Sequence, residues 1–100
     1  MKYNKLVRDN IPKYLEDKGI PFEMHVADDL EYWVKLKLKL GEEAAEFNDA
    51  ESIDELADVL EVIKAIQSKM GWSDEDLESA RIKKLNDRGG FTKRIILDES

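Results

Sequence analysis

The stretch Leu40-Gly-Glu-Glu-Ala-Ala-Glu-Phe47, followed by Asp54-Glu-Leu-Ala-Asp-Val-Leu-Glu61, places two pairs of carboxylates near the middle of the chain. The pairs are Glu43 with Glu46, and Glu55 with Asp58. Residues three positions apart on a helix project from nearly the same face. Two such helices packed antiparallel would bring the carboxylates together, which is costly unless a cation lies between them. Because hard divalent cations such as Mg²⁺ prefer oxygen ligands, the spacing suggests a metal site.

Helix start and stop signals flank both pairs and recur along the chain. They predict helices from about Ile11 to Lys18, from Asp28 or Asp29 to about Asn48, from a Ser52 cap to about Met70, and from Asp74 to about Asp87. Residues 21–26 alternate apolar and polar side chains, and the tail 91–97 is β-prone and able to pair with the N-terminal segment. The predicted fold is therefore all-α, an antiparallel bundle of three to four helices with short extended N- and C-terminal segments.

The helical faces place one carboxylate of each pair against an apolar seam. Glu43 falls within the apolar arc of its predicted helix. On the following predicted helix, apolar residues lie on both sides of the direction in which Glu55 projects. Two structural alternatives stay open at this point. Ser52 and Glu55 have the spacing of a capping box, which would direct the Glu55 carboxylate back to the helix start. Lys39, four residues before Glu43, would form an ion pair with it.

Composition narrows the function classes. One hundred residues with 42% apolar content predict a single folded domain spanning residues 1–100, despite 39% charged residues. The net charge of −7 argues against binding to nucleic acid polymers or anionic membranes. There is no cysteine and one histidine, so thiolate and His-rich metal sites are excluded. With no apolar run of membrane-spanning length and no signal-peptide core, we expect a cytoplasmic protein.

Taken together, the central motifs and both flanks resemble a known family. The pattern of residues 40–47 and 54–61 resembles the EExxE…ExxD signature of the all-α nucleoside triphosphate pyrophosphohydrolases, which include MazG-like proteins, dimeric dUTPases and phosphoribosyl-ATP pyrophosphohydrolases. Tyr3-Asn-Lys-Leu-Val-Arg-Asp-Asn-Ile-Pro12 and Arg88-Gly-Gly-Phe-Thr-Lys-Arg-Ile-Ile96 resemble the ends of small bacterial and phage members that are phosphoribosyl-ATP pyrophosphohydrolase-like. The resemblance covers nearly the whole chain.

The resemblance implies Mg²⁺-dependent hydrolysis of a nucleoside triphosphate to the monophosphate and pyrophosphate, with Mn²⁺ as a substitute, by a homodimer or homotetramer. It assigns metal binding to Glu43, Glu46, Glu55 and Asp58, and orientation or deprotonation of the attacking water to Glu42. Because phosphoryl chemistry also needs cations around the phosphates, we expect substrate-binding side chains among the basic residues near the start of the chain, on the last predicted helix and in the tail. The candidates are Lys5, Arg8, Lys84, Arg88, Lys93 and Arg94.

One feature departs from the family, and it leaves the substrate open. Residues 47–54 separate the carboxylate pairs, which is shorter than in larger members, and this puts the shape of the base pocket in doubt. Two other functions remain as alternatives: a catalytically weak module that binds nucleotide or metal, and a structural helical oligomer whose carboxylates serve as caps and ion pairs.

Overall fold

Four α-helices make up the secondary structure of residues 4–100, the part of the chain that this computed structural model describes. They are α1 (Ile11–Asp17), α2 (Asp29–Ala50), α3 (Ile53–Met70) and α4 (Asp74–Arg88). The prediction of an all-α fold with extended ends is confirmed, and each helix ends within about two residues of its predicted position, as expected for boundaries read from capping signals. Residues 21–26 and 91–97 form no strand, so the pairing that the β-prone tail made possible is absent from residues 4–100.

Local side-chain chemistry explains where the helices begin and end. The Asp28 carboxylate accepts a hydrogen bond from the Glu31 amide, and the Ser52 hydroxyl accepts one from the Glu55 amide, so α2 and α3 both start at a polar cap. At the other end of α3, Gly71 adopts a left-handed conformation with φ of 74°, which costs glycine little. Only Glu51, also left-handed, and Ser52 separate α2 from α3, which makes the two helices an antiparallel hairpin.

The packed part of the molecule is this α2–α3 hairpin. Leu36 of α2 and Val62 of α3 are its buried apolar side chains, at 1% and 8% exposed. Every other pair of helices in residues 4–100 makes far less contact. The α2 segment reads Val34-Lys-Leu-Lys-Leu-Lys-Leu40, an alternation typical of a strand, yet it is helical, so Leu36 faces the seam while Leu38 stays exposed.

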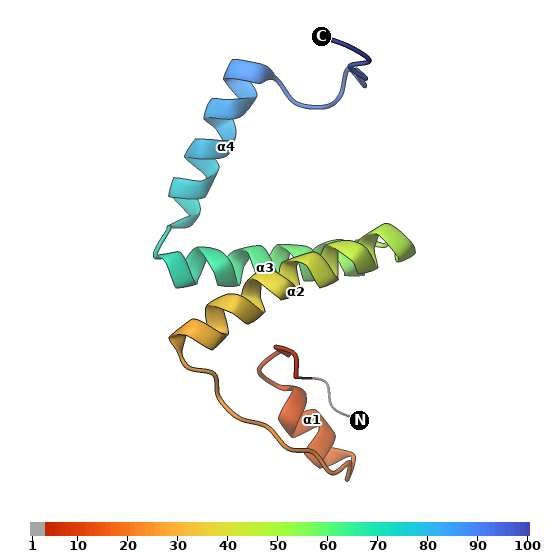
Figure 1. The fold of residues 1–100 in the computed structure, drawn as a ribbon, viewed down its shortest axis with the longest axis vertical. Coiled ribbons are helices and arrows are strands. Elements are labelled where there is room, and N and C mark those ends of the chain that lie inside the picture. Colours follow the sequence, from red (N-terminus) through yellow and green to blue (C-terminus); the bar gives the residue numbers. More distant parts are fainter. Residues whose placement is uncertain (1–3) are drawn as a thin grey trace.

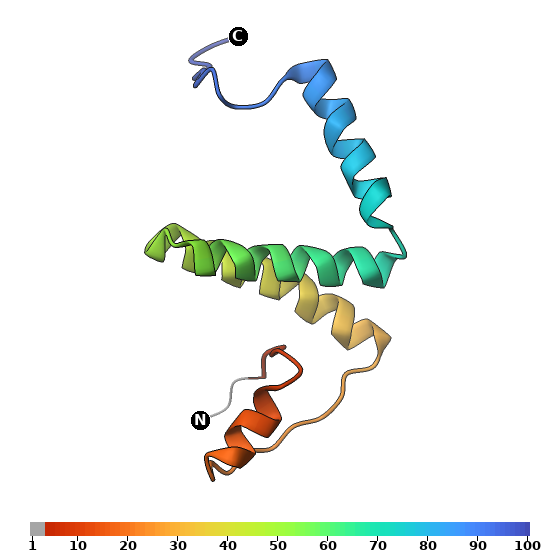
Figure 2. The ribbon, with the colours of Figure 1, turned by 180° about the vertical axis from the view of Figure 1, so that it is seen from behind.

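The remaining elements extend to either side of the hairpin. Figures 1 and 2 show the N-terminal segment and α1 on one side of the hairpin and α4 with the C-terminal tail on the other. The principal extents are 54 × 31 × 24 Å, and the radius of gyration of 17.6 Å exceeds the roughly 13 Å of a compact 100-residue domain. The hairpin alone therefore positions the carboxylates, and the N-terminal segment contacts one of its faces through polar groups.

Within residues 4–100, none of the helices has the length and apolar character that crossing a membrane requires.

Candidate metal centre

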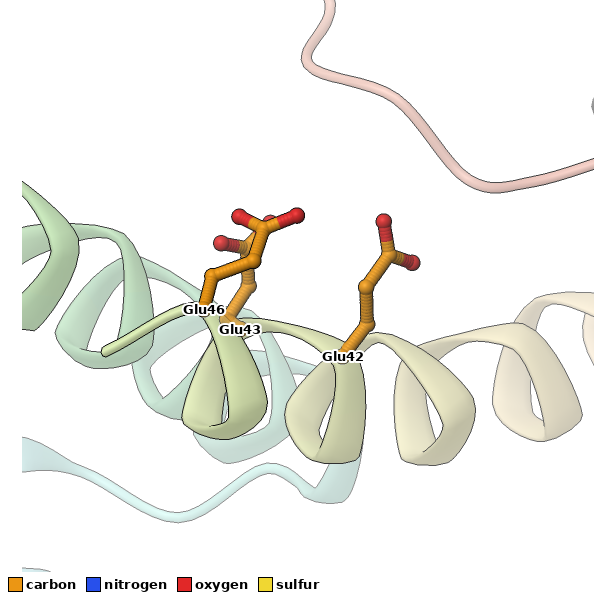
Figure 3. Close-up of side chains that lie close together, drawn as sticks. All are labelled: Glu42, Glu43 and Glu46. Atoms are coloured by element: carbon orange, nitrogen blue, oxygen red, sulfur yellow. The ribbon is translucent and has the colours of Figure 1, made fainter. Parts of the chain in front are cut away.

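The α2–α3 hairpin brings the predicted metal ligands together in two overlapping groups. Glu42, Glu43 and Glu46 form one group on α2, and Glu43 joins Glu55 and Asp58 of α3 in the other. In each group, one oxygen per residue lies within 4.8 Å of the others, close to the roughly 4.2 Å between opposite ligands of an octahedral Mg²⁺ site. Figure 3 shows the three α2 carboxylates projecting from the same side of the helix. Glu43 is common to both groups.

Two buried carboxylate oxygens lack a partner at this point. Oε2 of Glu43 and Oε2 of Glu55 are shielded from solvent and find no hydrogen-bond partner within residues 4–100. A buried charged oxygen without a partner is strongly unfavourable. Since both oxygens belong to the three-residue group that spans the two helices, a divalent cation fits this donor set.

The capping alternative for Glu55 is only half realised. Ser52 accepts a hydrogen bond from the Glu55 amide at 3.2 Å, but the return bond from the Ser52 amide to the Glu55 carboxylate is not formed. The helix α4 shows what the complete motif looks like, because Ser73 and Asp76 exchange both bonds, at 3.0 and 2.8 Å. The cap of α3 therefore leaves the Glu55 carboxylate available to the site.

Lys39 pairs with Glu43, as the second alternative anticipated, but it does not satisfy the whole carboxyl group. Its Nζ lies 3.4 Å from Oε1 of both Glu42 and Glu43, while Oε2 of Glu43 stays unpaired. Burial, and then the neighbouring Glu46 carboxylate, raise the pKa of Glu43 against the opposing effect of Lys39. Negative charge is thus unfavourable at Glu43, as it is in a site that needs a cation.

Glu42 has the opposite electrostatic environment. Its partial burial opposes ionisation, but the positive charge of Lys39 and the contacts with Lys5 outweigh that effect and lower the pKa of Glu42. The Lys5 Nζ lies 3.3 Å from Glu42 Oε1. Glu42 is therefore ionised at neutral pH and able to hold a water molecule or accept a proton.

The N-terminal segment supplies two of the predicted substrate-binding cations. Besides the Lys5 contact, Arg8 Nη2 donates a hydrogen bond of 2.6 Å to Asp58 Oδ1, joining residues fifty positions apart. Arg8 thus lies beside the predicted metal ligand Asp58, and Lys5 lies beside Glu42, the residue predicted to orient the attacking water. A role in substrate binding would require cations at such positions.

The other predicted substrate-binding residues lie elsewhere in this chain. Lys84 and Arg88 are on α4, and Lys93 and Arg94 are in the tail beyond it, which leads away from the hairpin (Figures 1 and 2). All four are exposed, and within residues 4–100 they make no ion pair with the carboxylates. Their assignment to the substrate stays a prediction.

Two lysines beside the site were not assigned to the substrate from the sequence. Lys35 and Lys39 lie one turn apart on α2, next to the N-terminal segment, and Lys35 Nζ donates a 2.7 Å hydrogen bond to the Asn4 carbonyl oxygen. Their i, i+4 spacing ahead of Glu42 was visible in the sequence. Their approach to the N-terminal segment depends on a long-range contact that the sequence does not reveal.

No protein-family model, curated protein or solved structure matches this chain at the significance required.

Proposed function

We propose that this protein is a Mg²⁺-dependent nucleoside triphosphate pyrophosphohydrolase, with Mn²⁺ able to replace Mg²⁺. The observation that carries the proposal is the pair of buried, unpartnered oxygens of Glu43 and Glu55 within a carboxylate group that also contains Asp58. From the N-terminal segment, Arg8 forms an ion pair with Asp58 of that group, and Lys5 forms one with the neighbouring Glu42. An oxygen-rich cation site flanked by basic side chains suits an anionic substrate that carries phosphate.

In the proposed reaction, a water oxygen attacks the α-phosphorus of the nucleotide. The bond from that phosphorus to the oxygen bridging to the β-phosphate breaks, and the electron pair leaves with pyrophosphate. Glu42, held ionised by Lys5 and Lys39, orients the water and accepts one of its protons. Because the pKa of Glu42 is lowered, orientation is the larger part of its role.

The cation site would be formed by Glu43, Glu46, Glu55 and Asp58. A Mg²⁺ ion held there would supply positive charge to the phosphate oxygens and lower the pKa of the attacking water. The chain's own contribution is to present these carboxylates from two helices and to keep Arg8 beside Asp58, from which the guanidinium can transfer its hydrogen bond to a phosphate oxygen.

The test is release of pyrophosphate from a panel of canonical and modified nucleoside triphosphates, with Mg²⁺, with Mn²⁺ and with chelator. We expect Asp58→Asn to reduce the rate by at least about a hundredfold while the helical content is retained. Asp54→Asn is the matched control, because Asp54 lies on the same helix, is exposed and belongs to neither carboxylate group.

Two results would contradict the proposal. Full activity of Asp58→Asn would remove the metal assignment. Metal-dependent nucleotide binding without pyrophosphate release, for every nucleotide tested, would favour the regulatory binding module instead.

We also propose that the working form is a homo-oligomer in which a second copy covers an apolar groove on α3. The groove has a volume of about 400 Å³ and only apolar lining side chains, among them Ile53, Leu56 and Leu60, each more than half exposed. The chain exposes 9236 Å², whereas a folded 11.6 kDa monomer is expected to expose about 5,800 Å². That excess of about 3,400 Å² is several times the roughly 800 Å² that each partner buries in a standard interface.

A second copy is the occupant favoured by these observations, because two hairpins that share an apolar face would complete a four-helix bundle. Either a dimer or a tetramer would bury this groove.

A further inference from the structure

A small groove with three lysines runs between the N-terminal segment and α2. It has a volume of about 40 Å³, and its charged lining consists of Lys5, Lys35, Lys39 and Glu42. Three lysines thus line one narrow groove, although the net charge of the chain is −7. The arrangement concentrates positive charge on one side of Glu42, directly beside the carboxylate groups.

We propose that this groove receives oxygens of the β- and γ-phosphates of the nucleotide, with Lys35 and Lys39 as phosphate-binding residues. The inference rests on the proposed function and deepens it, because it places the leaving pyrophosphate on the side of Glu42 away from Glu46. It also adds two residues of α2 to a substrate site that had included only residues of the flanks.

The lysine contacts in the groove leave donors available for an anion. An ammonium group has three N–H donors, and Lys35 uses one of them on the Asn4 carbonyl oxygen at 2.7 Å. Lys39 makes two long contacts of 3.4 Å with Glu42 and Glu43, and four-fifths of its side chain is shielded from solvent. Phosphate oxygens at shorter distance would form stronger, charge-assisted hydrogen bonds with both residues.

The position of the groove fits the leaving group of the reaction. Glu42 lines the groove and is also a member of the α2 carboxylate group, so a phosphate chain that starts at the cation site enters the groove at Glu42. Negative charge develops on the departing pyrophosphate when the bond to the α-phosphorus breaks, and fixed ammonium groups stabilise it there.

The size of the groove limits what it can select. A volume of about 40 Å³ holds roughly three water molecules, enough for phosphoryl oxygens but not for a nucleobase. The groove therefore recognises the phosphate chain, and any choice between bases must be made outside it.

The helix α2 offers a matched control for this inference. Lys37 lies between the two groove lysines in sequence, but its ammonium group sits over the Trp33 ring, 5.2 Å from the centroid, and it does not line the groove. Lys35→Ala and Lys37→Ala thus remove the same charge from the same helix, and only the first changes the groove.

The experiment measures binding of inorganic tripolyphosphate to the full chain by calorimetry in the presence of Mg²⁺. We expect Lys35→Ala to weaken binding about tenfold or more, as for loss of a charge-assisted hydrogen bond, and Lys37→Ala to change it less than about twofold. Lys35→Arg should restore most of the affinity, and circular dichroism should show equal helicity for all variants. In hydrolysis assays, Lys35→Ala should lower kcat as well as raise KM, because the charge that Lys35 stabilises on the leaving pyrophosphate develops in the transition state.

The outcomes separate this inference from the proposed function. Equal tripolyphosphate affinity of Lys35→Ala and Lys37→Ala, or no binding by the wild-type chain, would overturn the groove assignment even if nucleotides are hydrolysed. Conversely, Lys35-dependent binding of tripolyphosphate with no pyrophosphate release from any nucleotide would sustain the groove as a phosphate site and remove the enzyme assignment.

Discussion

The helices α3 and α4 start in the same way but end up in very different surroundings. Both begin after a serine whose hydroxyl accepts an amide hydrogen bond three residues on. The cap of α4 is complete, yet this helix buries none of its residues and leaves Leu77, Ile82 and Leu85 more than two-fifths exposed. The cap of α3 is half formed, and α3 packs along α2. A good cap defines where a helix starts, but it does not provide a packing partner.

The difference between the two caps also has a functional side. The Asp76 carboxylate accepts a hydrogen bond from the backbone amide of its cap residue Ser73, whereas the Glu55 carboxylate accepts none from Ser52 and stays between α2 and α3 with Glu43. The start of α3 therefore lacks one of the two stabilising hydrogen bonds of a capping box, and this is the helix start that lies next to the carboxylate groups. The helix α4 lies away from the candidate metal site, and there the carboxylate of Asp76 completes the helix cap.

The largest expected effect on stability comes from a substitution in the packed interface between α2 and α3. Leu36→Ala should lower the free energy of unfolding by about 2–5 kcal/mol, because Leu36 is fully enclosed in the α2–α3 seam. Leu77→Ala on α4 should cost less than about 1 kcal/mol, since Leu77 is 42% exposed. Urea unfolding at one fixed protein concentration measures both. An equally large loss for Leu77→Ala would mean that α4 has a packing partner in solution.

A second variant tests whether the exposed face of α3 has a partner. Leu60→Lys puts a charge into the apolar groove and should weaken self-association by at least about tenfold, as for a residue at the centre of an interface. Val26→Lys is the control, because Val26 is exposed in the segment before α2 and does not line the groove. Sedimentation velocity over a range of concentrations reports the change. A wild-type chain that stays monomeric at every concentration would refute the oligomer.

The smallest effect concerns the charge balance within the seam. The pKa of Glu43 is raised by burial and by Glu46, so folding favours the protonated form, and its stabilising contribution is lost as pH rises through that raised pKa. Without divalent cations, Glu43→Gln should therefore raise the melting temperature at neutral pH. This gain should be smaller than the loss in melting temperature that Leu36→Ala causes. The gain should disappear at pH values below the ordinary glutamate pKa of about 4.5.

Added Mg²⁺ should reverse the order of the two proteins in the same melting experiment. The wild-type chain gains stability from the cation and Glu43→Gln gains less, because a neutral amide is a poorer ligand. Failure of Mg²⁺ to stabilise the wild-type chain would argue for the structural reading of the carboxylates.

Much of the fold could be predicted because its signals are local. Capping residues, Gly71 and the apolar spacing of α2 and α3 act within a few residues, so the helix boundaries follow closely from the sequence. The carboxylate pairs behave similarly, because their spacing places each pair on one helix face and the short turn at Glu51 makes the helices antiparallel. The β-prone tail could have paired with the N-terminal segment, but β-propensity has little effect without a neighbouring strand.

The sequence by itself thus determined four helices and two acidic faces that meet across a hairpin. Only the tertiary structure decided which cations stand beside those faces: Arg8 on Asp58, Lys5 on Glu42, and Lys35 on the Asn4 carbonyl. It also decided that the carboxylate of Glu55 takes no part in the α3 cap, and that α4 leads away from the hairpin. The physical reason is distance along the chain. Helix geometry is set by neighbours a few residues apart, whereas these ion pairs join residues 37 and 50 positions apart and depend on how the N-terminal segment folds over α2.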